Sequence, residues 1–172
     1  GVNVQFNAWQ AEVAIAHTCG AQFIRVEVFV DTVISAQGMV QPCSAQITRY
    51  RKALGASGVA LFTDIQTKYT ANLIPQSIQQ SAIDAQNAGA DALIVTGAAT
   101  GAATPLDVVA EVKGVTSLPV IVGSGTNIGN VTQVLQVADG AIVGSSLKEG
   151  GKALNRVSRS AAADFMRAAR GR

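Results

Sequence analysis

The chain has 172 residues, 48% of them hydrophobic and only 14% charged, with a formal net charge of +2. This length and composition predict a single globular domain over residues 1–172, and no apolar run reaches the ~18 residues that would cross a membrane. His17 is the only histidine, so a metal site that needs two histidines is excluded. Cys19 and Cys43 lack the spacing of metal ligands, and we therefore expect no metal centre. No targeting segment is recognisable, and reduced thiols in a cytoplasmic protein are the default expectation.

Short apolar segments alternate with helical patterns along the chain. The expected strands are residues 2–6, 23–29, 59–65, 92–96, 119–123 and 140–144. The expected helices are residues 8–18, about 43–54, 77–88, 105–113, 127–137 and 158–170, with Ser77 and Asn127 as N-caps of two of them. This alternation predicts a parallel sheet covered by helices. The longest connection after a strand, residues 30–42, is expected to be a loop that covers the ligand.

About six βα units are fewer than the eight of a complete TIM (β/α)8 barrel. The alternatives are an open parallel α/β sheet and a barrel that lacks its first two units. In the strand at 23–29, alternation sends Arg25 and Glu27 to one face, where a sheet covered on both sides would have to pair them. A barrel interior near its ligand accommodates such groups, so we favour an N-terminally incomplete (β/α)8-type barrel. Bare strand edges would then favour homo-oligomers or pairing with a separate N-terminal segment.

Two glycine-rich turns near the C-terminus are the most informative segments. PVIVGSGTNIGN (119–130) and DGAIVGSSLKEGG (139–151) each place small residues directly after an apolar strand. Such turns let an anion approach backbone N–H groups, and (β/α)8 barrels bind phosphate after their last two strands. The candidate phosphate-binding residues are Gly123, Ser124, Gly125, Gly144 and Ser145. The alternative is that these glycines only shape the turns. A dinucleotide site is disfavoured, because the spacing is GxGxxxG instead of GxGxxG.

Two ionisable residues are the first candidates for catalysis. Asp64 ends an expected strand on its inner face and could act as a general base, or else make a structural hydrogen bond. Lys68 follows in the loop and could bind an anionic group or form an imine; a solvated lysine is the alternative.

Further polar residues lie at the ends of other expected strands. Glu27 is a third catalytic candidate, and Arg25 beside it is a ligand-binding candidate, unless the two form a structural ion pair. Asn3 and Thr96 are predicted ligand contacts, and the GAATG loop at 97–101 offers backbone donors.

Seven blocks carry a resemblance to a known family. They are GVNV, GAQFIRVEVF, QGMVQ, LFTDIQTKY, GADALIVTGAATGAAT, LPVIVGSGTNIGNV and ADGAIVGSSLKEGG. Their order and spacing resemble the BtpA/SgcQ family across essentially the whole chain. The resemblance implies the third to eighth units of a (β/α)8 barrel. Two positions depart from the family pattern: Glu27 replaces an asparagine, and Tyr69 replaces a histidine that could serve as a general acid or base.

Two functions follow as expectations from the residues and the resemblance. The first is a barrel that binds a phosphorylated or anionic sugar- or nucleoside-like molecule and acts on it as an enzyme. The second is a non-catalytic biogenesis factor for photosystem I, the role described for one branch of the family, with peripheral membrane association. Residues 148–172 carry a charge of +5 and could contact anionic lipid. No aromatic residues interleave these charges, so nucleic acid is not an expected partner, and no cofactor is indicated.

Overall fold

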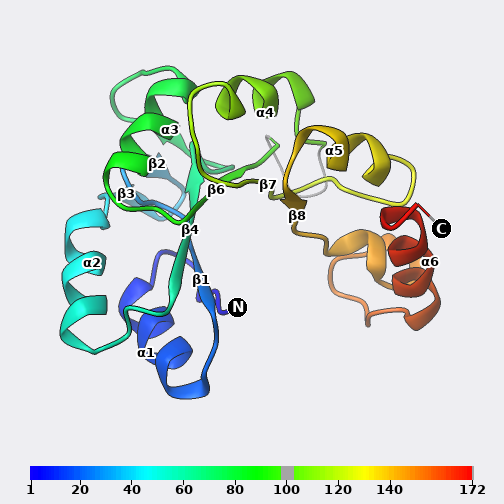
Figure 1. The fold of residues 1–172 in the computed structure, drawn as a ribbon, viewed down its shortest axis with the longest axis horizontal. Helices are drawn as coiled ribbons and strands as arrows, with labels where there is room; N and C mark the ends of the chain where they lie inside the picture. The colour runs from blue at the N-terminus through cyan, green and yellow to red at the C-terminus, as the bar shows by residue number, and fades with distance from the viewer. Residues whose placement is uncertain (98–102, 172) are drawn as a thin grey trace.

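A curved parallel sheet lies at the centre of the molecule (Figure 1). The computed structural model describes residues 1–97 and 103–171. The sheet has the order β1-β4-β6-β7-β8, and its strands are β1 (Phe23–Val26), β4 (Ala60–Ile65), β6 (Ala92–Val95), β7 (Val120–Val122) and β8 (Gly140–Ala141). All four pairings are parallel, as the sequence predicts.

The N-terminal segment contributes less to the sheet than expected. Val2 makes a parallel bridge to Ile24, but residues 2–6 do not form a strand. Hydrogen bonds to side chains draw this segment away, because Glu12 accepts from Val4 N and Glu27 accepts from Asn7 N. The expected strand is therefore reduced to a single bridge beside β1.

Six helices follow the bridge and the strands of the sheet. They are α1 (Trp9–Cys19), α2 (Ser44–Ala53), α3 (Ile78–Asn87), α4 (Leu106–Lys113), α5 (Val131–Val137) and α6 (Arg159–Ala169), and two 3₁₀ turns, η1 (Ser145–Leu147) and η2 (Glu149–Gly151), follow β8. Figure 1 shows the helices on the outer side of the curved sheet, with the inner side uncovered. The described residues thus form an open part of a (β/α)8-type barrel and do not close it.

Local signals in the sequence explain several of the helix ends. Ser77 caps α3 by accepting a hydrogen bond from Gln80 N, as predicted. The prediction for Asn127 is wrong, because α5 begins four residues later and follows Asn130. Asn127 Oδ1 instead accepts from Gly129 N at 2.8 Å and stabilises a turn before the helix.

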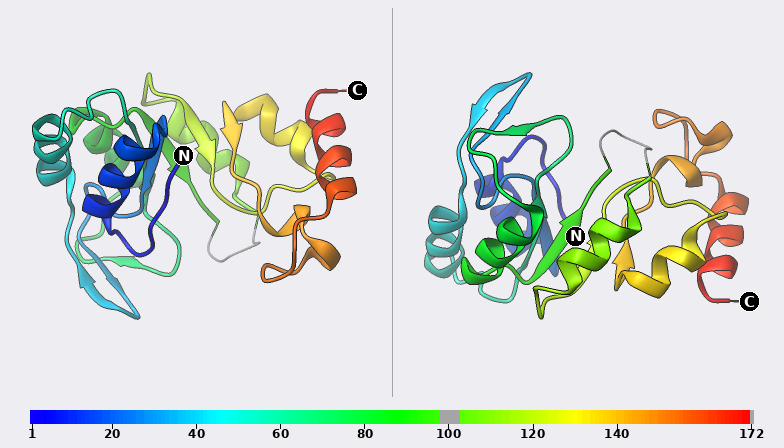
Figure 2. Two further views of the ribbon diagram at one scale, coloured as in Figure 1. Left: turned by 90° about the horizontal axis from the view of Figure 1, so that it is seen from below. Right: turned by 90° about the horizontal axis from the view of Figure 1, so that it is seen from above.

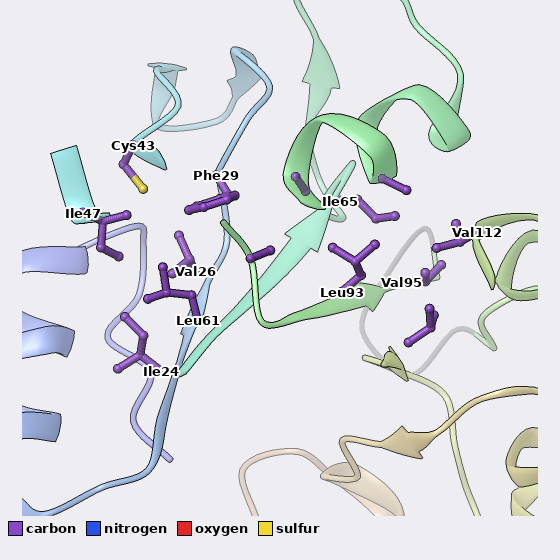
Figure 3. Packing of buried hydrophobic residues seen from close by; sticks show 14 of the residues in the cluster. Ile24, Val26, Phe29, Cys43, Ile47, Leu61, Ile65, Leu93, Val95 and Val112 are labelled. Carbon is purple, nitrogen blue, oxygen red and sulfur yellow. The ribbon is translucent and has the colours of Figure 1, made fainter. Parts of the chain in front are cut away.

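The core lies between the sheet and the helices (Figure 3). Ile24 and Val26 of β1 and Leu61 of β4 are fully buried there. Alternation along β1 places Arg25 on the opposite, inner face of the sheet. The expected direction of the polar side chains is therefore confirmed for β1.

A small antiparallel sheet occupies the region expected to be a loop. Within residues 30–42, β2 (Val33–Ser35) and β3 (Gly38–Val40) form a hairpin, and β5 (Ala71–Asn72) pairs with β2. Gly38 has a φ of 98°, which its missing side chain permits at the turn. In Figure 2 the hairpin and the segment after β8 lie on the same side of the molecule, at the bottom of the left view and at the top of the right view.

Two aspartates stabilise the sheet at the amino ends of its strands. Asp91 precedes β6 and accepts hydrogen bonds from Leu61 N and from Arg51 at 2.8 and 3.0 Å. Asp139 precedes β8 and accepts from Val120 N and from Lys113 at 2.8 and 2.7 Å. Each aspartate thus joins the start of a neighbouring strand to a preceding helix.

Candidate functional site

The two glycine-rich turns line one cavity at the carboxyl ends of β7 and β8. We call this cavity of about 410 Å³ the glycine-turn pocket; its lining residues are Lys68, Gly123, Ser124, Gly125, Thr126, Asn127, Ile142, Gly144, Ser145, Ser146 and Gly151. All five predicted phosphate-binding residues are among them. Ser146 Oγ donates to Thr126 O at 3.1 Å, which ties one turn directly to the other.

The turn after β7 requires glycine at two positions for different reasons. A Cβ on Gly123 would lie 2.6 Å from Ile94 Cγ2 and 2.8 Å from Thr96 Cγ2. Gly125 has a φ of 74°, which L side chains rarely adopt. Ser124 Oγ accepts from Gly97 N at 2.8 Å, so the turn is braced against the end of β6.

Two threonine hydroxyls beside these turns are buried and have no hydrogen-bond partner among the described residues. Thr126 is 4% exposed and lines the pocket, and its Oγ1 makes no hydrogen bond among the described residues. Thr96 Oγ1 is likewise unpartnered there, although Thr96 packs behind Gly123 and is not among the lining residues. Most of the predicted GAATG loop, residues 98–101, lies outside the described residues.

A second cavity lies beside the first. We call this space of about 270 Å³ the Glu27 cleft; it is lined by Asn3, Gln5, Phe6, Arg25, Glu27, Ser35, Gln37, Thr67, Lys68, Tyr69 and Thr70. The residues come from the N-terminal segment, the end of β1, the β2–β3 hairpin and the loop after β4. Lys68 lines both cavities.

Arg25 forms an ion pair across the sheet with Asp64. Its Nε and Nη2 donate to the two carboxylate oxygens of Asp64, each at 2.8 Å. Thr67 Oγ1 also donates to Asp64 Oδ2 at 3.0 Å. The alternative of an Arg25–Glu27 ion pair is not realised, because the neighbouring strand brings a better-placed, bidentate acceptor to Arg25.

Asp64 is held away from both cavities. It is 2% exposed, and it does not line the glycine-turn pocket or the Glu27 cleft. Because both of its oxygens accept hydrogen bonds, its geometry suits the fixing of Arg25. A side chain so placed has no direct route to a ligand in either cavity.

Glu27 is the carboxylate that faces the cleft. Its Oε2 accepts from Asn7 N at 3.1 Å, while burial raises the pKa of Glu27 above its usual 4.5. The hydrogen bond from Asn7 and the positive charges of Arg25 and Lys68 act in the opposite direction. A carboxyl group in this environment can exchange a proton closer to neutral pH than an exposed glutamate.

Glu12 supports the site from outside the cavities and was not predicted. This residue of α1 is fully buried, and its Oε1 accepts from Val4 N at 2.7 Å and from Asn3 Nδ2 at 3.0 Å. Burial raises the pKa of Glu12 to about 7. Asn3 also donates to Arg25 O at 3.1 Å, so the N-terminal segment is fixed to both α1 and β1. The available signal was a lone acid within the apolar stretch of residues 11–16.

Two other kinds of feature are missing from the described part of the chain. Within residues 1–97 and 103–171, no group of three or more His, Cys, Asp or Glu side chains could hold a metal ion. No helix in the same two ranges is both long and apolar enough to cross a membrane.

A curved parallel sheet with helices outside and cavities at the carboxyl ends of its strands defines a TIM-barrel-type protein. N-(5'-phosphoribosyl)anthranilate isomerase from Pyrococcus furiosus has a similar structure, with a TM-score of 0.61 and 18% identity over 99% of this chain and 73% of that one. At this identity the likeness concerns the fold alone. The chain itself belongs to the BtpA family, whose model matches residues 1–171.

The relatives that match this chain in sequence are longer than it. An uncharacterized mitochondrial protein of Caenorhabditis elegans is 37% identical over 97% of this chain and 61% of its own length. The photosystem I biogenesis protein BtpA of Synechocystis is 35% identical over 88% of this chain and 53% of its own length. The chain thus spans about 60% of the first of these relatives and about half of the second.

Proposed function

We propose that this BtpA-family chain binds a phosphorylated or otherwise anionic small molecule in the glycine-turn pocket. The observation that carries the proposal is the convergence of both turns on one cavity together with the Lys68 side chain. None of the described residues that line this pocket is acidic. The hydroxyl of Thr126, which no described residue pairs, adds a donor that a ligand oxygen could satisfy.

The cleft beside the pocket offers groups for chemistry on such a ligand. Glu27 has a raised pKa and suits proton transfer, and Lys68 can stabilise a negative charge. In this scheme Asp64 acts as a positioning residue that fixes Arg25 through the bidentate ion pair. The barrel would then be an enzyme whose reaction takes place between the two cavities.

A charge introduced at Gly144 tests the anion site. A Cβ at this position meets nothing within 4 Å, so Gly144→Asp and the neutral, similarly sized Gly144→Asn should both be accommodated. A nearby unit charge in a partly exposed site changes a binding energy by about 1–3 kcal/mol. We therefore expect Gly144→Asp, but not Gly144→Asn, to weaken the binding of inorganic phosphate by about tenfold in calorimetric titrations. Equal affinities in the two variants would contradict an anion site here.

A second candidate function is that of an assembly factor at a membrane. The segment after η2 is basic and apolar at once: Leu154 is 99% exposed and Val157 63%, and Lys152 and Arg156 beside them are exposed as well. The similarity to the Synechocystis photosystem I biogenesis protein favours this role too. An apolar side chain among basic ones suits an anionic lipid surface.

Flotation on lipid vesicles tests this second candidate. We expect the chain to float with vesicles containing phosphatidylglycerol and to remain unbound with phosphatidylcholine alone. Leu154→Asp should abolish flotation without affecting the fold, because the side chain is almost fully exposed. A chain that stays unbound with both kinds of vesicle excludes the membrane role.

A further inference from the structure

We propose that the glycine-turn pocket and the Glu27 cleft hold two parts of one ligand, an anion that carries several hydroxyl groups, such as a phosphorylated polyol. This inference rests on the proposed function, because it takes the anionic group to lie at the glycine turns. Lys68 lines both cavities, so a single molecule that spans them can contact this residue from either side. The two cavities, of about 410 and 270 Å³, adjoin at this residue.

Charge decides which part of the ligand goes to which cavity. The described lining of the glycine-turn pocket contributes a lysine and no carboxylate. The Glu27 cleft shares Lys68 with the pocket, and its Arg25 is already paired with Asp64. Its carboxylate, Glu27, repels an anionic group but accepts hydrogen bonds from hydroxyls. The anionic group therefore belongs at the glycine turns and the hydroxyl-bearing part at Glu27.

Unused hydrogen-bonding atoms give the cleft its affinity for hydroxyls. Glu27 Oε2 is occupied by Asn7 N, but Glu27 Oε1 makes no hydrogen bond in the part of the chain that the structure describes. Asn3 donates through Nδ2, and its Oδ1 accepts none from the described residues. Gln5 is exposed and adds an amide donor and acceptor. Hydroxyl groups both donate and accept, so this mixed set matches a polyol.

The supporting contacts keep these atoms in place before a ligand arrives. Glu12 holds Asn3 through a 3.0 Å hydrogen bond, and Asn7 Oδ1 accepts from Val28 N at 2.9 Å just beyond Glu27. Arg25 is fixed by both oxygens of Asp64. Polar groups fixed in this way lose little conformational freedom on binding, which favours a specific ligand.

Calorimetric titrations of the full chain with inorganic phosphate, glycerol 3-phosphate, ribose 5-phosphate and glucose 6-phosphate test the proposal. We expect at least one of the three hydroxyl-bearing phosphates to bind about tenfold more tightly than inorganic phosphate. Glu27→Ala should remove this advantage and leave the affinity for inorganic phosphate unchanged or improved. Gln5→Ala provides a second variant at an exposed position, and it should reduce the advantage by about threefold. Circular dichroism confirms that each variant is folded.

The outcomes separate this inference from the proposed function. Absence of phosphate binding to the wild-type chain overturns both. Phosphate binding with no gain from hydroxyls, or a gain that persists in folded Glu27→Ala and Gln5→Ala, overturns the two-part ligand and leaves the anion site standing.

Discussion

The buried carboxyl of Glu12 should make the stability of the fold depend on pH. Burial raises its pKa to about 7 from 4.5. As the pH rises from 4.5, the unfolded chain releases this proton before the folded chain does, so the free energy of unfolding falls until the pH passes 7. The difference between the two pKa values corresponds to about 3 kcal/mol, of which about 2.5 kcal/mol is lost between pH 5 and pH 8.

Glu12→Gln should remove this dependence. The amide oxygen of the new side chain would still accept from Val4 N and Asn3 Nδ2, and the second position, Oε2, has no partner among the described residues that the change would lose. We expect urea unfolding at pH 5 and pH 8 to give a free-energy difference about 2.5 kcal/mol smaller in the variant than in the wild type. Glu27 and Asp31, whose pKa values burial also raises, are present in both proteins and cancel. Parallel pH curves for the two proteins would refute the reasoning.

Two further substitutions test the packing and the ion pair of the inner face by urea unfolding. Gly123→Ala should destabilise the fold by about 1–3 kcal/mol, because its Cβ would lie 2.6 Å from Ile94 Cγ2. The control, Gly144→Ala, should have little effect, because its Cβ meets nothing within 4 Å. Similar losses of stability in both variants would show that the close approach at Gly123 is not the cause. Asp64→Asn should destabilise by about 3 kcal/mol, because it leaves the Arg25 charge buried and incompletely paired. The double replacement Arg25→Met/Asp64→Leu should recover part of that loss, and a double variant worse than the single one would contradict this account.

The sequence predicted the six helices and all the expected strands of the parallel sheet except residues 2–6, because the signals for these elements are local. Apolar runs and a capping serine at position 77 depend on neighbouring residues only. The hairpin within residues 30–42 was missed, because β2 is stabilised by pairing with β5, some forty residues away.

The candidate site could be predicted only in part for the same reason. Both glycine turns were found because each turn carries its own pattern of small residues. The ion pair of Arg25 with Asp64 was not foreseen, because Asp64 comes from the adjacent strand, whose register relative to β1 the sequence does not reveal. Glu12 was missed because a single acid on a helix does not indicate what it will be packed against.

The aspartates at the amino ends of the strands stabilise the sheet at a distance from the two cavities. Asp91 and Asp139 anchor the sheet at the end opposite the two cavities, Asp91 through Arg51 of α2 and Asp139 through Lys113 of α4. Changes that strengthen or weaken these ion pairs can alter the stability of the sheet, while the loops that line the two cavities at the opposite end keep their composition. The stability of the sheet and the lining of the cavities can therefore change independently of each other.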